Sequence, residues 1–123
     1  MFENRSCGID FGTSNSAIAI HDSNSARIIA VENDDITIPS AMFFTRNLPP
    51  FHGRKAIQMF LKGTEGRLMR SLKRVLGTSI MQQGTMINGK IMKFDQIIGG
   101  FINDMKNSAE TSIQNPIENV VLG

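Results

Sequence analysis

Residues 7–20 read CGIDFGTSNSAIAI, two short apolar runs joined by a turn of glycine, hydroxyl and amide side chains. In the first run, residues 7–11, apolar residues alternate with small or acidic ones, which is the period of a strand with one covered face. Residues 16–21 repeat that period after Gly12-Thr13-Ser14-Asn15. The sequence therefore predicts a β-hairpin whose most flexible and most polar residues form its turn.

The residues after this hairpin continue a sheet. Residues 26–31 form another apolar run, which follows the turn signal Asp22-Ser23-Asn24-Ser25 and ends at Asn33-Asp34-Asp35. A run between two turn signals predicts a third strand, so the opening is expected to be an antiparallel three-stranded meander. Residues 36–44 are expected to be extended as well, because Pro39 biases the residue before it away from helix.

The middle of the chain predicts two helices and a hairpin. Residues 54–62 fit a short helix and residues 67–76 a longer one. The second of these would have an apolar face of Leu68, Leu72, Val75 and Leu76. Asn88-Gly89 separates two apolar pairs, which is a strong signal for a two-residue hairpin turn.

The end of the chain predicts a long helix and a strand. Apolar residues recur at helical spacing over residues 94–113, Asn115-Pro116 ends the pattern, and residues 118–122 fit a buried strand. A helix that returns the chain to a parallel neighbour makes a right-handed crossover, which places the final strand beside the first one. The predicted class is α/β, with a mixed sheet in the order 3-2-1-4.

Composition is that of a single soluble domain. The 123 residues are 41% hydrophobic and 20% charged, enough for one core but not for two. Cys7 is the only cysteine, so no intramolecular disulfide or structural zinc site is expected, and a reducing, cytoplasmic location fits. Glu3 and Arg5 stand where a signal peptide would be apolar, and no apolar run is long enough to span a bilayer.

Charge is distributed unevenly along the chain. Residues 46–93 hold ten of the thirteen basic residues and one of the eleven acidic ones, Glu65. A basic stretch of this kind is one signature of nucleic-acid binding. However, its only aromatic residues are Phe51 and Phe60, and it contains no zinc, helix-turn-helix or RNA-binding motif. Nucleic acid is therefore the less favoured interpretation, and an outer subdomain with a solvated basic surface is favoured.

The polar turn is suited to an anion. Gly12 permits backbone angles that other residues avoid, so successive N–H groups can converge on a phosphate, and the residues after it add side-chain donors. Asp10 would repel a bare phosphate, but it would favour a hydrated divalent cation bound to one. The competing interpretation is an ordinary hairpin turn with Asp10 facing water.

Gly8-Ile9-Asp10-Phe11-Gly12-Thr13-Ser14-Asn15-Ser16 resembles the first phosphate motif of the seventy-kilodalton heat-shock chaperones, the DnaK-like family of the actin and sugar-kinase ATPase superfamily. Four further segments resemble that family in the same order. They are Val31-Glu32-Asn33, Thr37-Ile38-Pro39-Ser40, His52-Gly53-Arg54-Lys55-Ala56 and Leu72-Lys73-Arg74-Val75-Leu76-Gly77. Phe11 departs from the family's usual leucine, and the stretch over residues 81–93 is shorter than the family's, which together indicate a divergent bacterial branch.

The resemblance implies the first half of a ribonuclease-H-like, actin-like ATPase fold, with catalytic roles for two residues. Asp10 would hold Mg²⁺ through water, and Lys73 would reach the γ-phosphate; the less favoured alternative for Lys73 is a solvated lysine on a basic face. The residues that would contact the β- and γ-phosphates of ATP or ADP are Gly12, Thr13, Ser14 and Asn15. Residues 1–44 and 94–123 would form the core of a partial nucleotide-binding domain, and residues 45–93 an inserted outer subdomain.

By the same resemblance, the complete protein would couple ATP hydrolysis to protein folding, with unfolded peptides and co-chaperones as partners. The alternatives are a filament-forming or sugar-kinase relative and a non-catalytic scaffold that kept the fold. The family's second phosphate motif does not occur in these 123 residues, so the chain alone is expected to be inactive. Residues 119–121 would form an exposed apolar edge through which the isolated chain self-associates.

Overall fold

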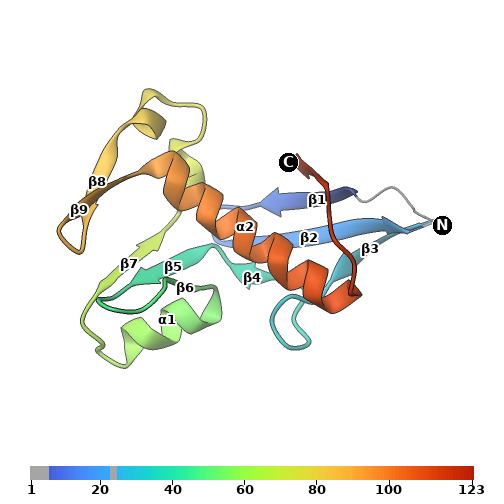
Figure 1. Ribbon diagram of the computed structural model, residues 1–123, viewed down its shortest axis with the longest axis horizontal. Coiled ribbons are helices and arrows are strands. Elements are labelled where there is room, and N and C mark those ends of the chain that lie inside the picture. The colour runs from blue at the N-terminus through green and yellow to red at the C-terminus, as the bar shows by residue number, and fades with distance from the viewer. Residues whose placement is uncertain (1–5, 23–24) are drawn as a thin grey trace.

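The predicted hairpin forms the centre of the larger sheet. In the computed structural model, which describes residues 6–22 and 25–123, strand β1 (Ser6–Phe11) runs antiparallel to β2 (Asn15–Asp22) (Figure 1). Strand β3 (Ser25–Ile29) pairs antiparallel with β2, which confirms the meander. Residues 23–24 of the expected turn and residues 1–5, on which the signal-peptide prediction rests, lie outside the described residues.

The end of the chain adds a strand on the other side of β1. Helix α2 (Phe94–Ile113) has the predicted bounds and leads to β10 (Asn119–Leu122), which lies parallel to β1 with Asn119 opposite Ser6. The order of the sheet is therefore β10-β1-β2-β3, which confirms the predicted 3-2-1-4 and the α/β class. A two-residue strand, β4 (Ile38–Pro39), pairs with the start of β2.

Helix α2 covers one face of this sheet, as Figure 1 shows. Its buried residues are Ile97, Ile98, Phe101, Met105 and Ala109. The rings of Phe101 and Phe11 lie 5.8 Å apart, so the helix stripe and the inward residues of β1 share one core. The opposite face has a shallow hollow of about 400 Å³ beside Asp10, Ala17 and Val121. One face of the sheet thus builds the core, while the other presents Asp10 to solvent.

A second, smaller sheet follows β4. It has the order β6-β5-β7 and consists of β5 (Ala41–Phe44), β6 (Phe51–His52) and β7 (Arg67–Arg70), with α1 (Arg54–Leu61) packed against it. All four residues of β5 are buried. Met42 and Phe44 belong to the main core, whereas Ala41 and Phe43 cluster with Ala56 of α1. Strand β5 therefore joins the smaller sheet to the main core.

The prediction of a helix over residues 67–76 is wrong. Residues 67–70 form strand β7, paired antiparallel with β5, and only Leu72–Val75 is helical, as one short 3₁₀ turn, η1. The buried strand β5 needs hydrogen-bonding partners on both sides; β6 supplies one and β7 the other. Tertiary pairing therefore overrides the local spacing of Leu68 and Leu72, which fits a helix only when read in isolation.

The hairpin around Asn88-Gly89 is confirmed. Strands β8 (Gly84–Ile87) and β9 (Lys90–Lys93) pair antiparallel, and φ is +52° for Asn88 and +79° for Gly89, as a type I′ turn requires. A short 3₁₀ turn, η2 (Ser79–Gln82), precedes the hairpin. The guanidinium of Arg67 donates to Thr85 Oγ1 and to the Met86 carbonyl, so the hairpin is tied to β7.

Strand β10 is exposed, so the prediction of a buried strand is wrong, whereas the expected exposed apolar edge is present. The exposed fraction is 39% for Val120, 68% for Val121 and 46% for Leu122. The reason is its position, because β10 is an edge of the sheet and no described strand pairs with its outer side. Within residues 6–22 and 25–123, no helix combines the length and the apolar character that a membrane span needs.

Candidate functional site

The turn between β1 and β2 depends on a glycine at its first position. A Cβ atom at Gly12 would collide with the carbonyl oxygen of Asn15, so the chain can close here only around glycine. Thr13, Ser14 and Asn15 are all exposed, although the strands on either side of the turn are half buried. The turn thus presents its polar residues to solvent while its own ends are held close together.

Ser40 holds this turn from the inside. Its hydroxyl donates to the Gly12 carbonyl at 2.8 Å, and its main-chain N–H donates to the Ser14 carbonyl at 3.0 Å. The hydroxyl oxygens of Ser40 and Ser16 lie 2.6 Å apart, and both side chains are buried. Sequence reasoning noticed Thr37-Ile38-Pro39-Ser40 only as a family segment and missed its contact with the turn.

Asp10 lies two residues before Gly12, on the face of β1 opposite the core. It stands across from Ala17 of β2 and is exposed. Among the described residues, no group of three or more His, Cys, Asp and Glu side chains could hold a metal ion. A single exposed carboxylate beside a turn of exposed hydroxyl and amide side chains nevertheless fits Mg²⁺, which keeps several waters and binds through one or two carboxylates plus phosphate oxygens.

Lys73 lies in η1 and is exposed, with Leu72 buried beside it as an anchor. Its link to the turn runs through two pairings. Ser40 bonds to the turn, the next residue, Ala41, stands opposite Arg70, and Lys73 follows three residues later. Ser71 has φ +58°, and this left-handed residue redirects the chain between β7 and η1. Lys73 therefore lies in a different element from the turn. Ser40 and the pairing of β5 with β7 connect the two elements.

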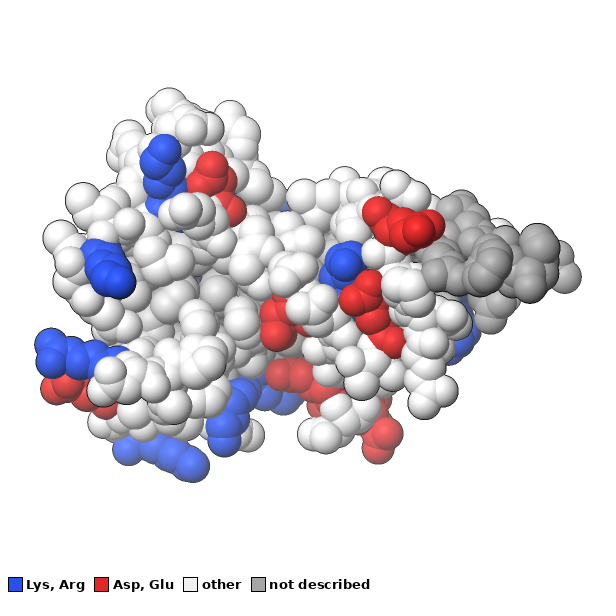
Figure 2. Space-filling view, viewed as in Figure 1, with Lys and Arg blue, Asp and Glu red and all other residues white. Residues whose placement is uncertain are grey.

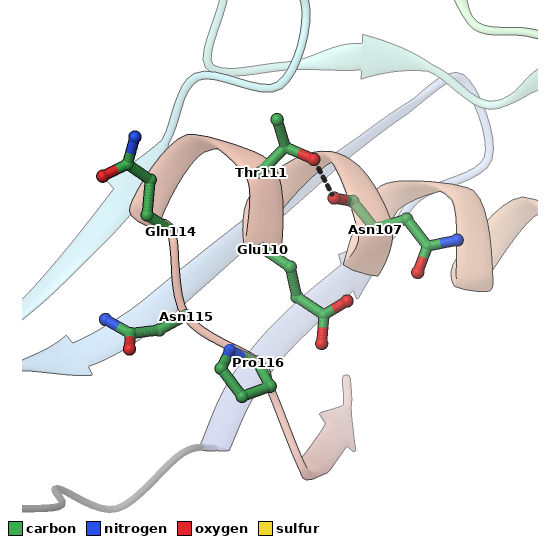
Figure 3. Close-up of a pocket in the computed structure, with 6 residues that line it drawn as sticks. All are labelled: Asn107, Glu110, Thr111, Gln114, Asn115 and Pro116. Carbon is green, nitrogen blue, oxygen red and sulfur yellow. Dashed lines mark hydrogen bonds between the residues drawn. The ribbon is translucent and has the colours of Figure 1, made fainter.

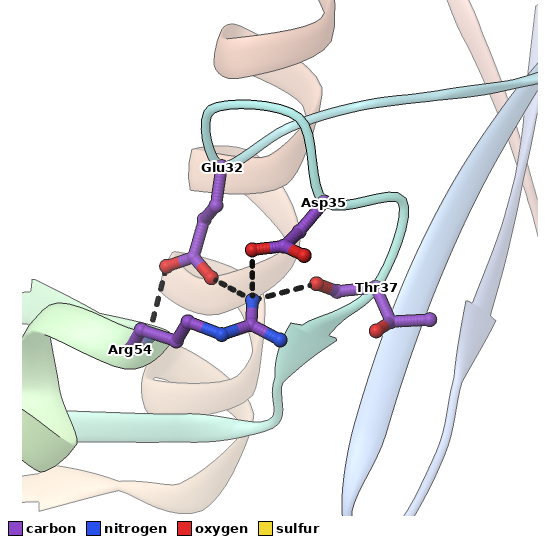
Figure 4. A network of polar contacts seen from close by, with 4 residues as sticks. All are labelled: Glu32, Asp35, Thr37 and Arg54. Atoms are coloured by element: carbon purple, nitrogen blue, oxygen red, sulfur yellow. Dashed lines mark hydrogen bonds and ion pairs between the residues drawn. The ribbon is translucent and has the colours of Figure 1, made fainter.

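Two segments that the sequence shows far apart meet around Arg54 (Figure 4). Glu32 accepts the main-chain N–H of Arg54 at 2.8 Å and its guanidinium at 2.7 Å, and the guanidinium also donates to the Thr37 carbonyl. Asp35 adds an ion pair at 3.5 Å. Gly53, at φ +67°, leaves room for Glu32, since a Cβ there would collide with its carboxylate. Glu32 thereby fixes the start of α1, and with it the smaller sheet.

A family model described as "Hsp70 protein" matches residues 6–123. The chain belongs to the Hsp70 family. "Chaperone protein DnaK" of Metamycoplasma hominis is 28% identical over 115 residues, which is 94% of this chain and 18% of that protein. "Chaperone protein DnaK" of Mycoplasma mobile is 30% identical over 122 residues, 99% of this chain and 19% of that protein.

A third relative extends the comparison to eukaryotes. The mitochondrial heat shock protein SSC3 of Saccharomyces cerevisiae is 29% identical over 136 residues, 94% of this chain and 21% of that protein. This Hsp70-family chain thus spans about a fifth of the length of the curated relatives it matches. Its fold is that of an N-terminal DnaK-like segment, and a filament-forming or sugar-kinase relative is not favoured.

The basic stretch of this Hsp70-family chain does not form one continuous surface in the view of Figure 2. On that face the Lys and Arg side chains lie mostly over α1 and β7–β9, and uncharged or acidic atoms separate most of them. Arg54 and Arg67 have structural partners, an acid and a hairpin respectively. The arrangement on this face therefore supports an outer layer of solvated basic side chains rather than a nucleic-acid groove.

His52 connects the smaller sheet of the Hsp70-family chain to α2. Its Nδ1 lies 3.5 Å from Asp104 Oδ1, and its ring centroid is 6.2 Å from that of Phe101. Burial lowers the pKa of His52 below its ordinary 6.5, and the Asp104 carboxylate opposes that shift. The other ring nitrogen, Nε2, is buried without a hydrogen-bond partner. This contact fixes the position of β6 on the helix.

The other end of α2 carries a polar hollow lined by Asn107, Glu110 and the residues of the following turn (Figure 3). Glu110 accepts the main-chain N–H of Ile117 at 2.6 Å and pairs with Lys106 at 3.3 Å. The bond from Ile117 and the Lys106 charge lower the pKa of Glu110. Glu110 thus fixes the turn that leads from α2 into β10. Its carboxylate in the hollow therefore has a structural role.

Proposed function

We propose that this chain forms one wall of an ATP-binding cleft, as the N-terminal segment of a DnaK-like chaperone. The observation that supports this most directly is the turn at Gly12, closed only around glycine and braced from inside by Ser40, with exposed donors beside the exposed carboxylate of Asp10. Residues 1–44 and 94–123 form the core subdomain in this proposal, and residues 45–93 the inserted outer one.

Each site residue has one role in the proposal. The turn residues Gly12, Thr13, Ser14 and Asn15 contact the β- and γ-phosphates of ATP or ADP. Asp10 holds Mg²⁺ through water, and Lys73 places its ammonium beside the γ-phosphate. When bound, Mg²⁺ neutralises phosphate charge and orients the terminal phosphate. The protein side chains bind and position the nucleotide, while main-chain N–H groups supply fixed donors that need no reorganisation.

In the complete protein, ATP binding and hydrolysis would be coupled to protein folding, with unfolded peptides and co-chaperones as partners in the cytoplasm. The 123-residue chain by itself binds Mg·ATP weakly and does not hydrolyse it measurably. The reason is solvent exposure, because Thr13, Asp10 and Lys73 all face water and electrostatic stabilisation is much weaker there than in a closed cleft.

Titration of the chain with nucleotide tests these roles. Chemical-shift changes of the turn amides should follow Mg·ATP binding at millimolar concentration. Lys73→Ala should remove the preference for ATP over ADP, because only ATP has the γ-phosphate that Lys73 contacts. Asp10→Asn should remove the dependence on Mg²⁺. Lys62→Ala is the control for loss of one exposed lysine outside the site.

Other results would contradict these roles. If Lys73→Ala left the ATP preference unchanged, or if Mg·ATP shifted amides elsewhere but not those of residues 12–15, the site assignment would be wrong. Measurable ATP turnover by the chain alone, unchanged in Lys73→Ala, would contradict the proposal as well.

A further inference from the structure

Ser16 and Ser40 are buried polar residues of the described chain, 2% and 4% exposed. A hydroxyl group removed from water costs free energy unless it finds a hydrogen-bond partner. Here each hydroxyl has one: Ser16 contacts Ser40, and Ser40 bonds to Gly12 of the turn between β1 and β2. The pair therefore has to be explained by what it does for that turn.

Donor accounting fixes the direction of these bonds. A serine hydroxyl has a single hydrogen to donate. Ser40 uses its hydrogen on the Gly12 carbonyl, so in the 2.6 Å contact between the two hydroxyls Ser16 is the donor. The bonds run in one direction, from Ser16 to Ser40 to Gly12, and Ser16 holds the Ser40 hydroxyl in the orientation that reaches the turn.

The planarity of the peptide bond carries this orientation to the other side of the turn. In a trans peptide, the carbonyl of one residue and the N–H of the next point in opposite directions. Ser40 draws the carbonyls of Gly12 and Ser14 toward itself. The N–H groups of Thr13 and Asn15 consequently point away from Ser40.

We infer that Ser40 is a positioning residue for the nucleotide phosphates, one that aims the Thr13 and Asn15 amides of the turn. This inference rests on the proposed function, in which those amides contact phosphate. Fixed amide donors bind an anion without loss of backbone freedom on binding, which is the general advantage of a preorganised anion site. The same residue also precedes β5, whose pairing with β7 leads to Lys73. Ser40 therefore connects the turn at Gly12 to the strand pair that leads to Lys73.

Ser40→Ala tests the inference in the 123-residue chain. The variant leaves the Gly12 carbonyl and the Ser16 hydroxyl without their partner, so the NMR order parameters of the Thr13, Ser14 and Asn15 amides should fall while those of the buried α2 amides stay unchanged. Binding of Mg·ATP should weaken about tenfold, the effect of losing one hydrogen bond of ordinary strength. Ser40→Thr keeps the hydroxyl and should restore both properties.

Two further variants complete the test. Ser16→Ala keeps the bond from Ser40 to Gly12 but releases the Ser40 hydroxyl to rotate, so its effect on the order parameters of the turn should be smaller, and it decides the question if Ser40→Ala does not fold. Thr45→Ala removes a hydroxyl-to-carbonyl bond, to Glu65, outside the turn and should change neither the order parameters of the turn nor binding.

The possible outcomes separate the two proposals. A fall in order parameters confined to the turn, with rescue by Ser40→Thr, supports the positioning role, even if the unmodified chain fails to bind Mg·ATP, in which case the proposed function fails. Turn amides whose order parameters are the same in Ser40→Ala as in the unmodified chain overturn the inference. A fall spread equally over the turn and α2, with no rescue by threonine, overturns it too, because that pattern is general destabilisation.

Discussion

Glu32 should stabilise the fold through its bond to a backbone N–H as well as through its ion pair. The comparison needs three variants, Glu32→Ala, Glu32→Gln and Arg54→Ala. Glu32→Ala removes both the acceptor of the Arg54 N–H and the partner of its guanidinium. Glu32→Gln keeps an oxygen for the N–H but removes the charge, and Arg54→Ala keeps the N–H bond but removes the guanidinium.

The structure gives the size of each effect. Loss of a side-chain acceptor at the start of a helix costs about 1 kcal/mol. The Arg54 side chain is 41% exposed, so its ion pair with Glu32 contributes about 1 kcal/mol or less. Glu32→Ala should therefore destabilise by about 2 kcal/mol, and the other two variants by about 1 kcal/mol each. For a chain of this length, these values correspond to falls in Tm of roughly 8 °C and 4 °C.

Thermal unfolding followed by circular dichroism, at low salt and at about 1 M NaCl, measures these differences. Salt screens the ion pair, so the effect of Arg54→Ala should shrink at high salt, whereas about half of the effect of Glu32→Ala, the part due to the N–H bond, should remain. The reasoning is refuted if Arg54→Ala lowers Tm as much as Glu32→Ala at both salt concentrations, because the ion pair would then carry the whole stabilisation.

Two other properties of the chain can be predicted from the same structure. The pKa of Glu110 is lowered on folding, so its contribution to stability is present above its ordinary value near 4.5 and is lost as pH falls through the lower folded value. Glu110→Gln should therefore lose less stability than the unmodified chain between about pH 6 and about pH 3, as urea midpoints will show. Strand β10 exposes Val121 and Leu122 on a free edge, so light scattering on the isolated chain should report self-association. Val121→Lys should reduce it, and a strictly monomeric unmodified chain would contradict the prediction.

Elements with a local cause could be predicted from the sequence. The bounds of α2 follow from an apolar repeat that Asn115-Pro116 ends, and the turn at Asn88-Gly89 follows from the positive φ that both residues tolerate. The hairpin of Asp10 and Gly12 is likewise contiguous in sequence, so its residues had to lie together. In each case the information lies within a few residues of the structure that it determines.

Elements with a distant cause could not be predicted in this way. Strand β7 forms because β5, more than twenty residues earlier, needs a partner, and nothing within residues 67–76 indicates that need. The contact between Ser40 and Gly12 spans 28 residues, and that between Glu32 and Arg54 spans 22. The segments that resemble the family include these residues, but the resemblance does not indicate which segments are in contact.

Residues 31–40 show why such contacts matter for the site. This stretch has little regular structure, yet Glu32 holds the start of α1, β4 pairs with β2, and Ser40 holds the turn at Gly12. The stretch then continues directly into β5, whose partner strand leads to Lys73. A shift of the turn would therefore have to move Ser40, and through the adjoining strand it would move the smaller sheet. A segment that reads as a loop in the sequence is thus the part of the chain that couples the turn, the helix and the lysine.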